Sequence, residues 1–328
     1  MVLTGSQTDA HATTRDAHSL AQPLYVQPSI WSHDITTHAA GCSNIAWPSV
    51  GAVFDWVCEV PAGAPSRAAK CSVTAALSLV GLCKSFGLKR AVDHLDLEVR
   101  RGCMFGLVGP NGAGKTTTLS MATGLLRPDA GTARVLDHDV WADPAAAKAL
   151  MGVLPDGLRL FDRLSGAELL RYVGLLRRVP VAEIATRSAE LLDALALTDD
   201  RDTLVVEYSA GMTKKIGLAC ALIHAPRLLI LDEPFEAVDP VSGEVIRSIL
   251  RNYAQAGGTV VMSSHVMELV ESLCDDLAVV ARGRVLATGT IDEVRAGSSL
   301  QQRFLDLVGF TAAGEESLAW LRSSSGSS

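Results

Sequence analysis

The chain has 328 residues, of which 48% are hydrophobic and 20% charged, and its formal net charge is -7. This length suits one or two ordinary domains with a sizeable core. The lack of a basic excess argues against a nucleic-acid binder that works by bulk charge. Seven dispersed cysteines without CxxC spacing favour free thiols over a zinc site. No apolar run reaches about 18 residues and no basic-then-apolar leader opens the chain, so we expect neither a membrane span nor a signal peptide.

Residues 1–74 differ in pattern from the rest of the chain. They show no sustained period of 3.6 or 2, and "PAGAPSRAAK" at 61–70 is typical of a linker. One interpretation is a disordered extension, or an over-long gene prediction whose true start lies nearer Val73. The alternative is a small accessory module that docks on a partner through its aromatic side chains: Trp31, Trp47 and Trp56.

From Ala75 onwards strands alternate with helices. Apolar or alternating runs predict strands at 77–86, 91–99, 103–109, 227–232 and 258–264, and a hairpin at 275–289. Helical periodicity predicts helices at 115–126, 165–179, 181–197 and 241–256. Ser165 and Glu168 form a capping box at the start of the second helix. The pattern predicts an α/β domain at 75–309, with a mixed, largely parallel sheet and a helical insertion near 164–208, followed by a flexible tail at 310–328.

A glycine-rich stretch, "GPNGAGKT", lies between the strand at 103–109 and the helix at 115–126. It matches the spacing G-x-x-x-x-G-K-[ST] of a P-loop NTPase core, in which backbone N–H groups and a helix N-terminus converge on phosphate oxygens. Lys115 is expected to reach the β- and γ-phosphates of ATP, and the Thr116 hydroxyl to ligate Mg²⁺. The alternative, a glycine turn that merely precedes a helix, is disfavoured by the flanking elements. The predicted nucleotide-binding residues of this phosphate loop are Gly109, Pro110, Asn111, Gly112, Ala113, Gly114, Lys115, Thr116 and Thr117.

Two consecutive acids follow the apolar run "LLIL". A carboxylate at the carboxyl end of a buried strand faces the edge where open α/β sheets bind ligands. Asp232 is therefore predicted to hold Mg²⁺, through water, and Glu233 to polarise the attacking water as a catalytic residue. The alternative is a strand-terminal acid that caps the next turn.

The stretch "YSAGM" at 208–212 begins a helix shortly before this acidic strand. The Ser209 hydroxyl, the close backbone approach at Gly211 and the helix dipole all suit an anion, whereas a plain N-cap serine is the alternative. The order of motifs resembles that of ATP-binding cassette ATPases, the nucleotide-binding subunits of ABC transporters, over about residues 76–309. The family's signature is usually LSGGQ, and the form here is similar to that of ABC-2-type exporter ATPases. The resemblance implies that Ser209 and Gly211 bind the γ-phosphate held by a second subunit in a head-to-tail dimer.

Further positions resemble the family's site residues one at a time. His265 in "SSH" resembles the switch histidine that contacts the γ-phosphate, and Phe86 in "KSFG" resembles the aromatic that stacks on adenine. Asp239 occupies the aspartate position of the D-loop, where Glu236 and Ala237 depart from the usual Ser-Gly-Leu-Asp.

One departure concerns metal and water. "GVLPDG" puts Asp156 where the family usually has a glutamine that touches Mg²⁺ or the lytic water and couples to the membrane subunit. Aspartate can still serve as a water-mediated ligand at the nucleotide and the metal, but its side chain is shorter than that of glutamine and carries a charge.

These residues together predict an ATPase that powers an ABC-2-type exporter, with ATP and Mg²⁺ as its cofactors and Lys115, Glu233 and His265 as its catalytic residues. The resemblance implies a peripheral location on the cytoplasmic face of the cell membrane, an integral-membrane permease and a second ATP-binding subunit, with no nucleic acid. The permease would dock near residues 156–163, and Phe161 and Leu164 are the side chains expected to test this contact. Two alternatives stay open: a soluble cassette ATPase acting on the ribosome or DNA, and a regulatory, low-activity partner in a heterodimeric transporter.

Overall fold

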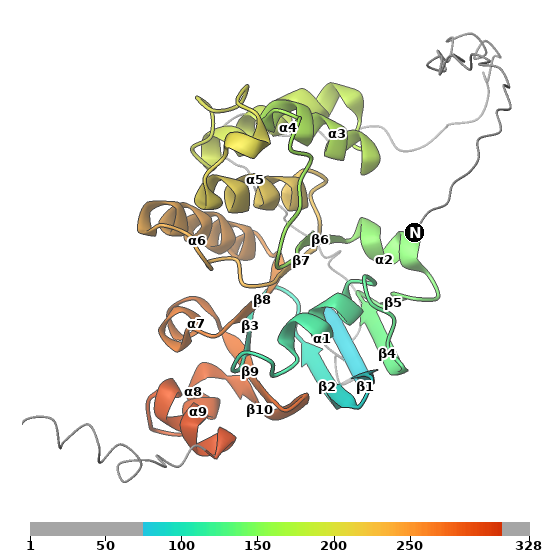
Figure 1. The fold of residues 1–328 in the computed structure, drawn as a ribbon, viewed down its shortest axis with the longest axis vertical. Helices are drawn as coiled ribbons and strands as arrows, with labels where there is room; N and C mark the ends of the chain where they lie inside the picture. Colours follow the sequence, from blue (N-terminus) through green and yellow to red (C-terminus); the bar gives the residue numbers. More distant parts are fainter. Residues whose placement is uncertain (1–74, 310–328) are drawn as a thin grey trace, which may run out of the picture. The chain divides into compact units, whose positions relative to one another are not determined.

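Two sheets frame the domain in a computed structural model that describes residues 75–309 (Figure 1). One sheet is antiparallel, with the order β2-β1-β4-β5, and consists of β1 (Leu77–Phe86), β2 (Lys89–Val99), β4 (Ala130–Val135) and β5 (His138–Asp139). The other has the order β10-β9-β3-β8-β7-β6 and consists of β3 (Met104–Val108), β6 (Met151–Leu154), β7 (Leu228–Leu231), β8 (Thr259–Ser264), β9 (Asp276–Ala281) and β10 (Arg284–Thr290). Its pairs are parallel except for the β9–β10 hairpin, so the predicted mixed sheet is confirmed.

The central strand β3 is buried at every position because the larger sheet is covered on both faces. Met104 and Val108 contribute to an apolar cluster with helices on one face of this sheet. Phe105 and Leu107 point the other way, into a cluster shared with α1 and the antiparallel sheet. A strand packed in this way presents its carboxyl end, and the loop that follows it, at a rigid edge of the sheet.

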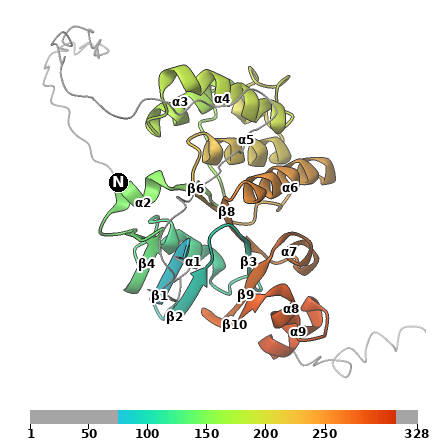
Figure 2. The same ribbon diagram turned by 180° about the vertical axis from the view of Figure 1, so that it is seen from behind.

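Helices fill both sides of the larger sheet (Figures 1 and 2). They are α1 (Lys115–Ala122), α2 (Pro144–Ala149), α3 (Gly166–Leu176), α4 (Val181–Ala194), α5 (Ala210–Leu222), α6 (Pro240–Gln255), α7 (Met267–Leu273), α8 (Ile291–Arg295) and α9 (Leu300–Val308), with a 3₁₀ turn at Val205–Glu207. Within residues 75–309, no helix combines the length and the apolar character that crossing a membrane would need.

Helices α3 and α4 lie at the end of the larger sheet opposite β10, as both views show (Figures 1 and 2). The capping box that was predicted at the start of α3 is present: the Ser165 hydroxyl accepts from the Glu168 N–H, and Glu168 accepts from the Ser165 N–H. The helix ends at Leu176, earlier than predicted, because Arg178 adopts a φ of 59° shortly before Pro180, the N-cap of α4. Both helices pack on α5, which joins this helical layer to the sheet through β6.

Several elements were not predicted from the sequence. Strands β4 and β5, helix α2 and the strand β6 lie between the phosphate loop and α3, and α7 follows β8. Helix α2 carried a usable signal, since Asp143 caps it through the Ala146 N–H and Pro144 occupies its first turn. The interpretations offered for residues 1–74 and 310–328 concern segments outside the described residues.

Candidate functional site

The phosphate loop joins the end of β3 to the start of α1, as predicted. Gly114 takes a φ of 107°, and a Cβ there would lie 2.5 Å from the Ala91 carbonyl oxygen, so only glycine fits this N-cap position. The Lys115 ammonium turns back into the loop and donates to the Gly109 carbonyl at 2.8 Å. The β9–β10 turn supports the loop from outside, because the Gly283 N–H donates to the Ala113 carbonyl at 2.9 Å. The loop is therefore held in shape by contacts from β2 and from the β9–β10 turn.

Asp232 lies directly after β7, with 4% of its surface exposed. The Ser263 hydroxyl at the end of β8 donates to Asp232 Oδ1 at 2.5 Å. Burial raises the pKa of Asp232 above the ordinary aspartate value, although hydrogen bonds from Ser263 and Thr116 act in the opposite direction. A buried carboxylate that carries this cost suits the binding of a cation.

Replacing Asp232 with Asn is expected to raise the melting temperature of the nucleotide-free protein at pH 8. A raised folded-state pKa means that ionisation disfavours the native state, so the cost is complete above that pKa and disappears as the pH falls below the unfolded value near 3.8. The gain in the variant should therefore shrink as the pH is lowered toward 4. Thermal melts of wild type, Asp232→Asn and the exposed control Asp199→Asn check this, and a lower melting temperature for Asp232→Asn at pH 8 would contradict it.

Glu233 brings the predicted catalytic residues together. Its carboxylate lies 3.4 Å from Lys115 Nζ through Oε1 and 3.1 Å from His265 Nδ1 through Oε2. Glu233 also adopts a φ of 47°, in the left-handed region that non-glycine residues rarely occupy. Glu233, the second residue after β7, therefore meets the residue after β8 and the first residue of α1 at the carboxyl edge of the larger sheet.

Asp156 shares a small pocket with the predicted metal ligands. Thr116, Asp156 and Asp232 all line it, together with apolar residues of α1, β6 and β7. The Asp156 side chain is exposed, and its Oδ1 accepts from the Gly157 N–H at 2.8 Å. The negative charge of Asp156 contributes to the raised pKa of Asp232, so the two carboxyl groups repel one another.

The signature residues are engaged within their own chain. Ser209 caps α5 by accepting from the Met212 N–H at 3.2 Å, which is the N-cap role that the sequence left open. A Cβ on Gly211 would lie 2.8 Å from Asp239 Oδ2 and 2.9 Å from Ser242 Oγ. Asp239 in turn caps α6 through the N–H groups of Val241 and Ser242. The signature and the D-loop aspartate are thus adjacent, while their action on a second subunit's nucleotide stays a prediction.

Phe86 ends β1 with 53% of its surface exposed, and the Lys84 ammonium lies 6.0 Å from its ring centroid. An exposed aromatic ring at a strand end can stack on a flat ligand. Stacking of this ring on adenine stays a prediction.

Sequence reasoning missed two residues that contact Glu233. The Ser263 hydroxyl accepts from the Glu233 N–H at 2.9 Å, while it donates to Asp232. The Lys214 ammonium donates to the Glu233 carbonyl oxygen at 2.9 Å. Both residues lie close in the sequence to predicted site residues. Neither hydrophobic periodicity nor motif spacing indicates the direction in which the Ser263 or Lys214 side chain points.

Comparison with known proteins gives one consistent family. A family model described as ABC transporter matches residues 92–236. The daunorubicin/doxorubicin resistance ATP-binding protein DrrA of Streptomyces peucetius is 40% identical over 234 residues, which cover 71% of this chain and 70% of that protein. The linearmycin resistance ATP-binding protein LnrL of Bacillus subtilis is 36% identical, with 63% of this chain and 67% of that protein covered. A Nod factor export ATP-binding protein I of Ralstonia nicotianae is 38% identical, with 67% and 69% covered.

Solved structures agree with the sequence relatives. An ATP-binding subunit of an ABC transporter superposes with a TM-score of 0.66 at 28% identity, over 70% of this chain and 98% of that one. A dimeric ATP-binding cassette in a post-hydrolysis state, bound to ADP and Pi, gives a TM-score of 0.61 at 20% identity, over 66% and 98%, and supports the fold alone.

Proposed function

The chain belongs to the ABC transporter family as an ATP-binding subunit, and from this premise we propose that it hydrolyses ATP to power an ABC-2-type membrane exporter. The relatives are named for drug resistance and for Nod factor export. Because these names mention different compounds, they support the proposal that cargo is selected by the membrane partner.

One observation carries the proposal: the meeting of Lys115, Glu233 and His265 beside the phosphate loop. A carboxylate at hydrogen-bond distance from an imidazole, with a buried ammonium on its other side, can hold a water molecule against a γ-phosphate. Phosphoryl transfer needs such positioning and electrostatic stabilisation more than covalent chemistry.

The residues present fit Mg²⁺. The Thr116 hydroxyl and the Asp232 carboxylate supply hard oxygen donors in one pocket, which Mg²⁺ prefers, and the raised pKa of Asp232 is the cost that a bound cation would relieve. When bound, Mg²⁺ neutralises charge on the phosphate oxygens. Asp156 lines the same pocket and, as an exposed carboxylate, acts through water.

Each of the site residues then has a separate role. The loop N–H groups and Lys115 bind and neutralise the β- and γ-phosphates. Glu233 orients the attacking water and accepts its proton, while His265, hydrogen-bonded to Glu233 Oε2, contacts the γ-phosphate. Phe86 stacks on adenine, and Ser209 and Gly211 complete the site of a second subunit.

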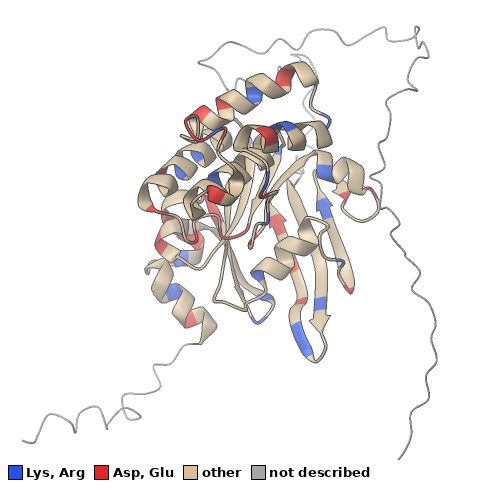
Figure 3. Cartoon of the chain, turned by 45° about the horizontal axis from the view of Figure 1, so that its top comes forward, with Lys and Arg blue, Asp and Glu red and all other residues tan. Residues whose placement is uncertain are grey.

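We further propose two kinds of protein partner: a second ATP-binding subunit, and an integral-membrane permease that keeps this chain at the cytoplasmic face of the membrane. The alternative of a nucleic-acid substrate has less support, because acidic and basic residues are interspersed along the elements in view in Figure 3 and the net charge is -7. The alternative of a regulatory, low-activity subunit has less support, because every predicted catalytic position except Asp156 carries the residue usual in the family.

The exposure of Phe161 and Leu164 indicates which of the two side chains is available to contact the permease. Phe161 is 55% exposed, and its ring packs edge-on against Tyr172 of α3, with 5.1 Å between centroids. Leu164 is half-buried and packs against the apolar cluster. A change at Leu164 therefore tests folding as much as docking, whereas Phe161 tests docking.

A tagged purification from detergent-solubilised membranes tests the proposal. We expect a stoichiometric, multi-span membrane protein to co-purify with the wild type, to be lost with Phe161→Asp and to be kept with Leu286→Asp, an exposed apolar control on β10. Basal ATPase activity should be unchanged in both variants. Recovery of the wild type only in the soluble fraction, with ribosomes or alone, would contradict the exporter assignment.

A further inference from the structure

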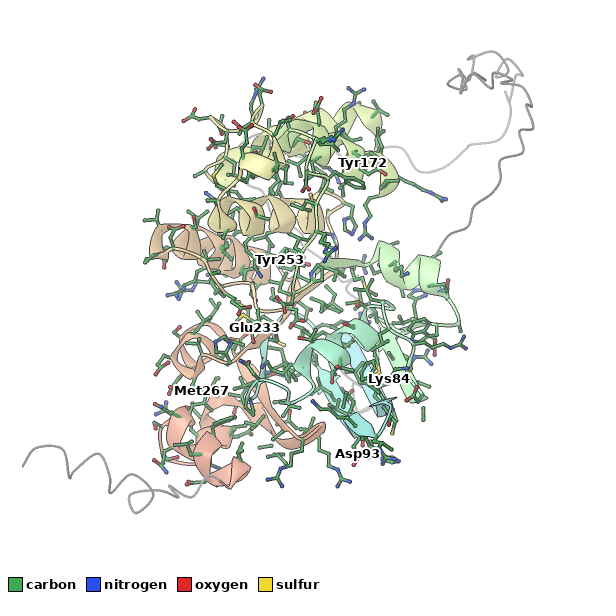
Figure 4. All side chains as sticks on the ribbon, viewed as in Figure 1. Lys84, Asp93, Tyr172, Glu233, Tyr253 and Met267 are labelled. Atoms are coloured by element: carbon green, nitrogen blue, oxygen red, sulfur yellow. The ribbon has the colours of Figure 1, made fainter. Side chains whose placement is uncertain are left out.

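Glu233 is held through its main chain as well as through its carboxylate. Its N–H donates to Ser263 Oγ at 2.9 Å, and its carbonyl oxygen accepts from Lys214 Nζ at 2.9 Å and from the Glu236 N–H at 3.2 Å. Figure 4 shows Glu233 at the centre of the domain, between α6, α7 and α1. The two side chains that contact its main chain come from different elements, Ser263 from β8 and Lys214 from α5.

These contacts stabilise the left-handed backbone conformation of Glu233. A non-glycine residue at a φ of 47° is strained, and it keeps that conformation only where its surroundings fix it. The conformation decides where the carboxylate points, because rotation about φ would move it away from Lys115 and His265. A charged donor on the carbonyl oxygen is a strong restraint on that rotation.

Lys214 also links this carbonyl to the signature helix. Ser209 caps α5, and Gly211 packs against Asp239 and Ser242 at the start of α6. Lys214 lies three residues after Gly211, so both residues share one face of the helix. The first turns of α5 therefore contact both ends of the segment 233–242.

We infer that Lys214 is a positioning residue for hydrolysis, which holds Glu233 in its strained conformation and ties that conformation to the position of the signature helix in the same subunit. The inference rests on the proposed role of Glu233 in orienting water. When α5 moves as its N-terminus engages a second subunit's nucleotide, Lys214 moves the carbonyl of Glu233 with it. The subunit's own water-orienting carboxylate is thereby linked to the nucleotide that its signature binds.

The neighbouring lysine provides a matched control. Lys215 is on the same helix, is 6% exposed, and donates to the Ala196 carbonyl at 3.3 Å, away from the site. Methionine keeps an unbranched apolar side chain, one atom shorter than that of lysine, and removes the donor. On the full-length chain, Lys214→Met is expected to lower kcat about tenfold and to leave KM within about twofold, which corresponds to the loss of one charge-assisted hydrogen bond. Lys215→Met should leave both kinetic parameters within about twofold, and Lys214→Arg, which keeps a donor, should recover most of kcat.

A double-mutant cycle separates positioning from a general structural effect. If Lys214 acts through Glu233, Lys214→Met should not lower the residual rate of Glu233→Gln any further. If the double variant instead loses kcat by the product of the two single losses, Lys214 acts independently of Glu233, and the inference is overturned. An equal loss of kcat in Lys215→Met, or a rise in KM with unchanged kcat in Lys214→Met, would also overturn it.

The same cycle distinguishes failure of the inference from failure of the role proposed for Glu233. If Glu233→Gln keeps wild-type hydrolysis, the assignment of Glu233 is wrong and the inference falls with it. If Glu233→Gln is inactive while Lys214→Met is fully active, the proposed function stands and only the inference is overturned. Melting temperatures of all variants identify any loss of kcat that comes from unfolding.

Discussion

Replacing Glu233 with Gln is expected to lower kcat by about two to three orders of magnitude, while the dissociation constant for ATP stays within about threefold of wild type. The amide has nearly the shape of the carboxylate but cannot act as a base for the proton of water, and it no longer forms the ion pair with Lys115. The phosphate loop itself is unchanged. Phosphate release gives kcat, and titration with a fluorescent ATP analogue gives the affinity.

Glu190→Gln is the control for this experiment, because Glu190 is an exposed glutamate on α4, outside the pocket. It should match wild type in both measurements. Substantial residual hydrolysis in Glu233→Gln would mean that another residue activates the water. A parallel loss of ATP affinity would mean that Glu233 supports the loop rather than the chemistry.

Replacing Lys115 with Met is expected to weaken ATP binding roughly 10- to 100-fold and to reduce hydrolysis to background. Lys115 is 6% exposed, and its ammonium lies between the loop carbonyl of Gly109 and the carboxylate of Glu233. Methionine fills the same space but offers no charge to the phosphates. The variant also removes the ammonium beside the Glu233 carboxylate. The uncompensated negative charge of Glu233 should then disfavour the binding of an anion at this site.

Isothermal titration calorimetry with ATP and Mg²⁺ measures the affinity for ATP. Lys148→Ala on the exposed face of α2 is the control. If Lys115→Met binds ATP with wild-type affinity, the assignment of the phosphate loop to nucleotide binding is wrong. Since the variant removes a buried charge, a melt in the absence of nucleotide should accompany the titration. A folded variant with weakened binding is the expected result.

The conformation of the glycine-rich loop and the place of the strand-end acid were predictable because both depend on consecutive residues. The N–H groups that surround a phosphate come from one loop, and the glycine conformation at Gly114 is required within that loop. Asp232 was predictable for a similar reason, since an acid after a short apolar run lies at the end of a buried strand. The capping box at Ser165 is also a local pattern, and the structure contains it.

The sequence by itself thus determined the family, the phosphate loop, the acidic strand end and the alternation of strands and helices. Only the tertiary structure decided which side chains meet: Glu233 and His265, which are 32 residues apart, and Glu233 and Lys214, which are 19 residues apart. It also decided that the strands divide between an antiparallel and a mixed sheet. The physical reason is that periodicity reports which face of an element is apolar, whereas strand order and the contacts of polar side chains depend on how separate elements pack together.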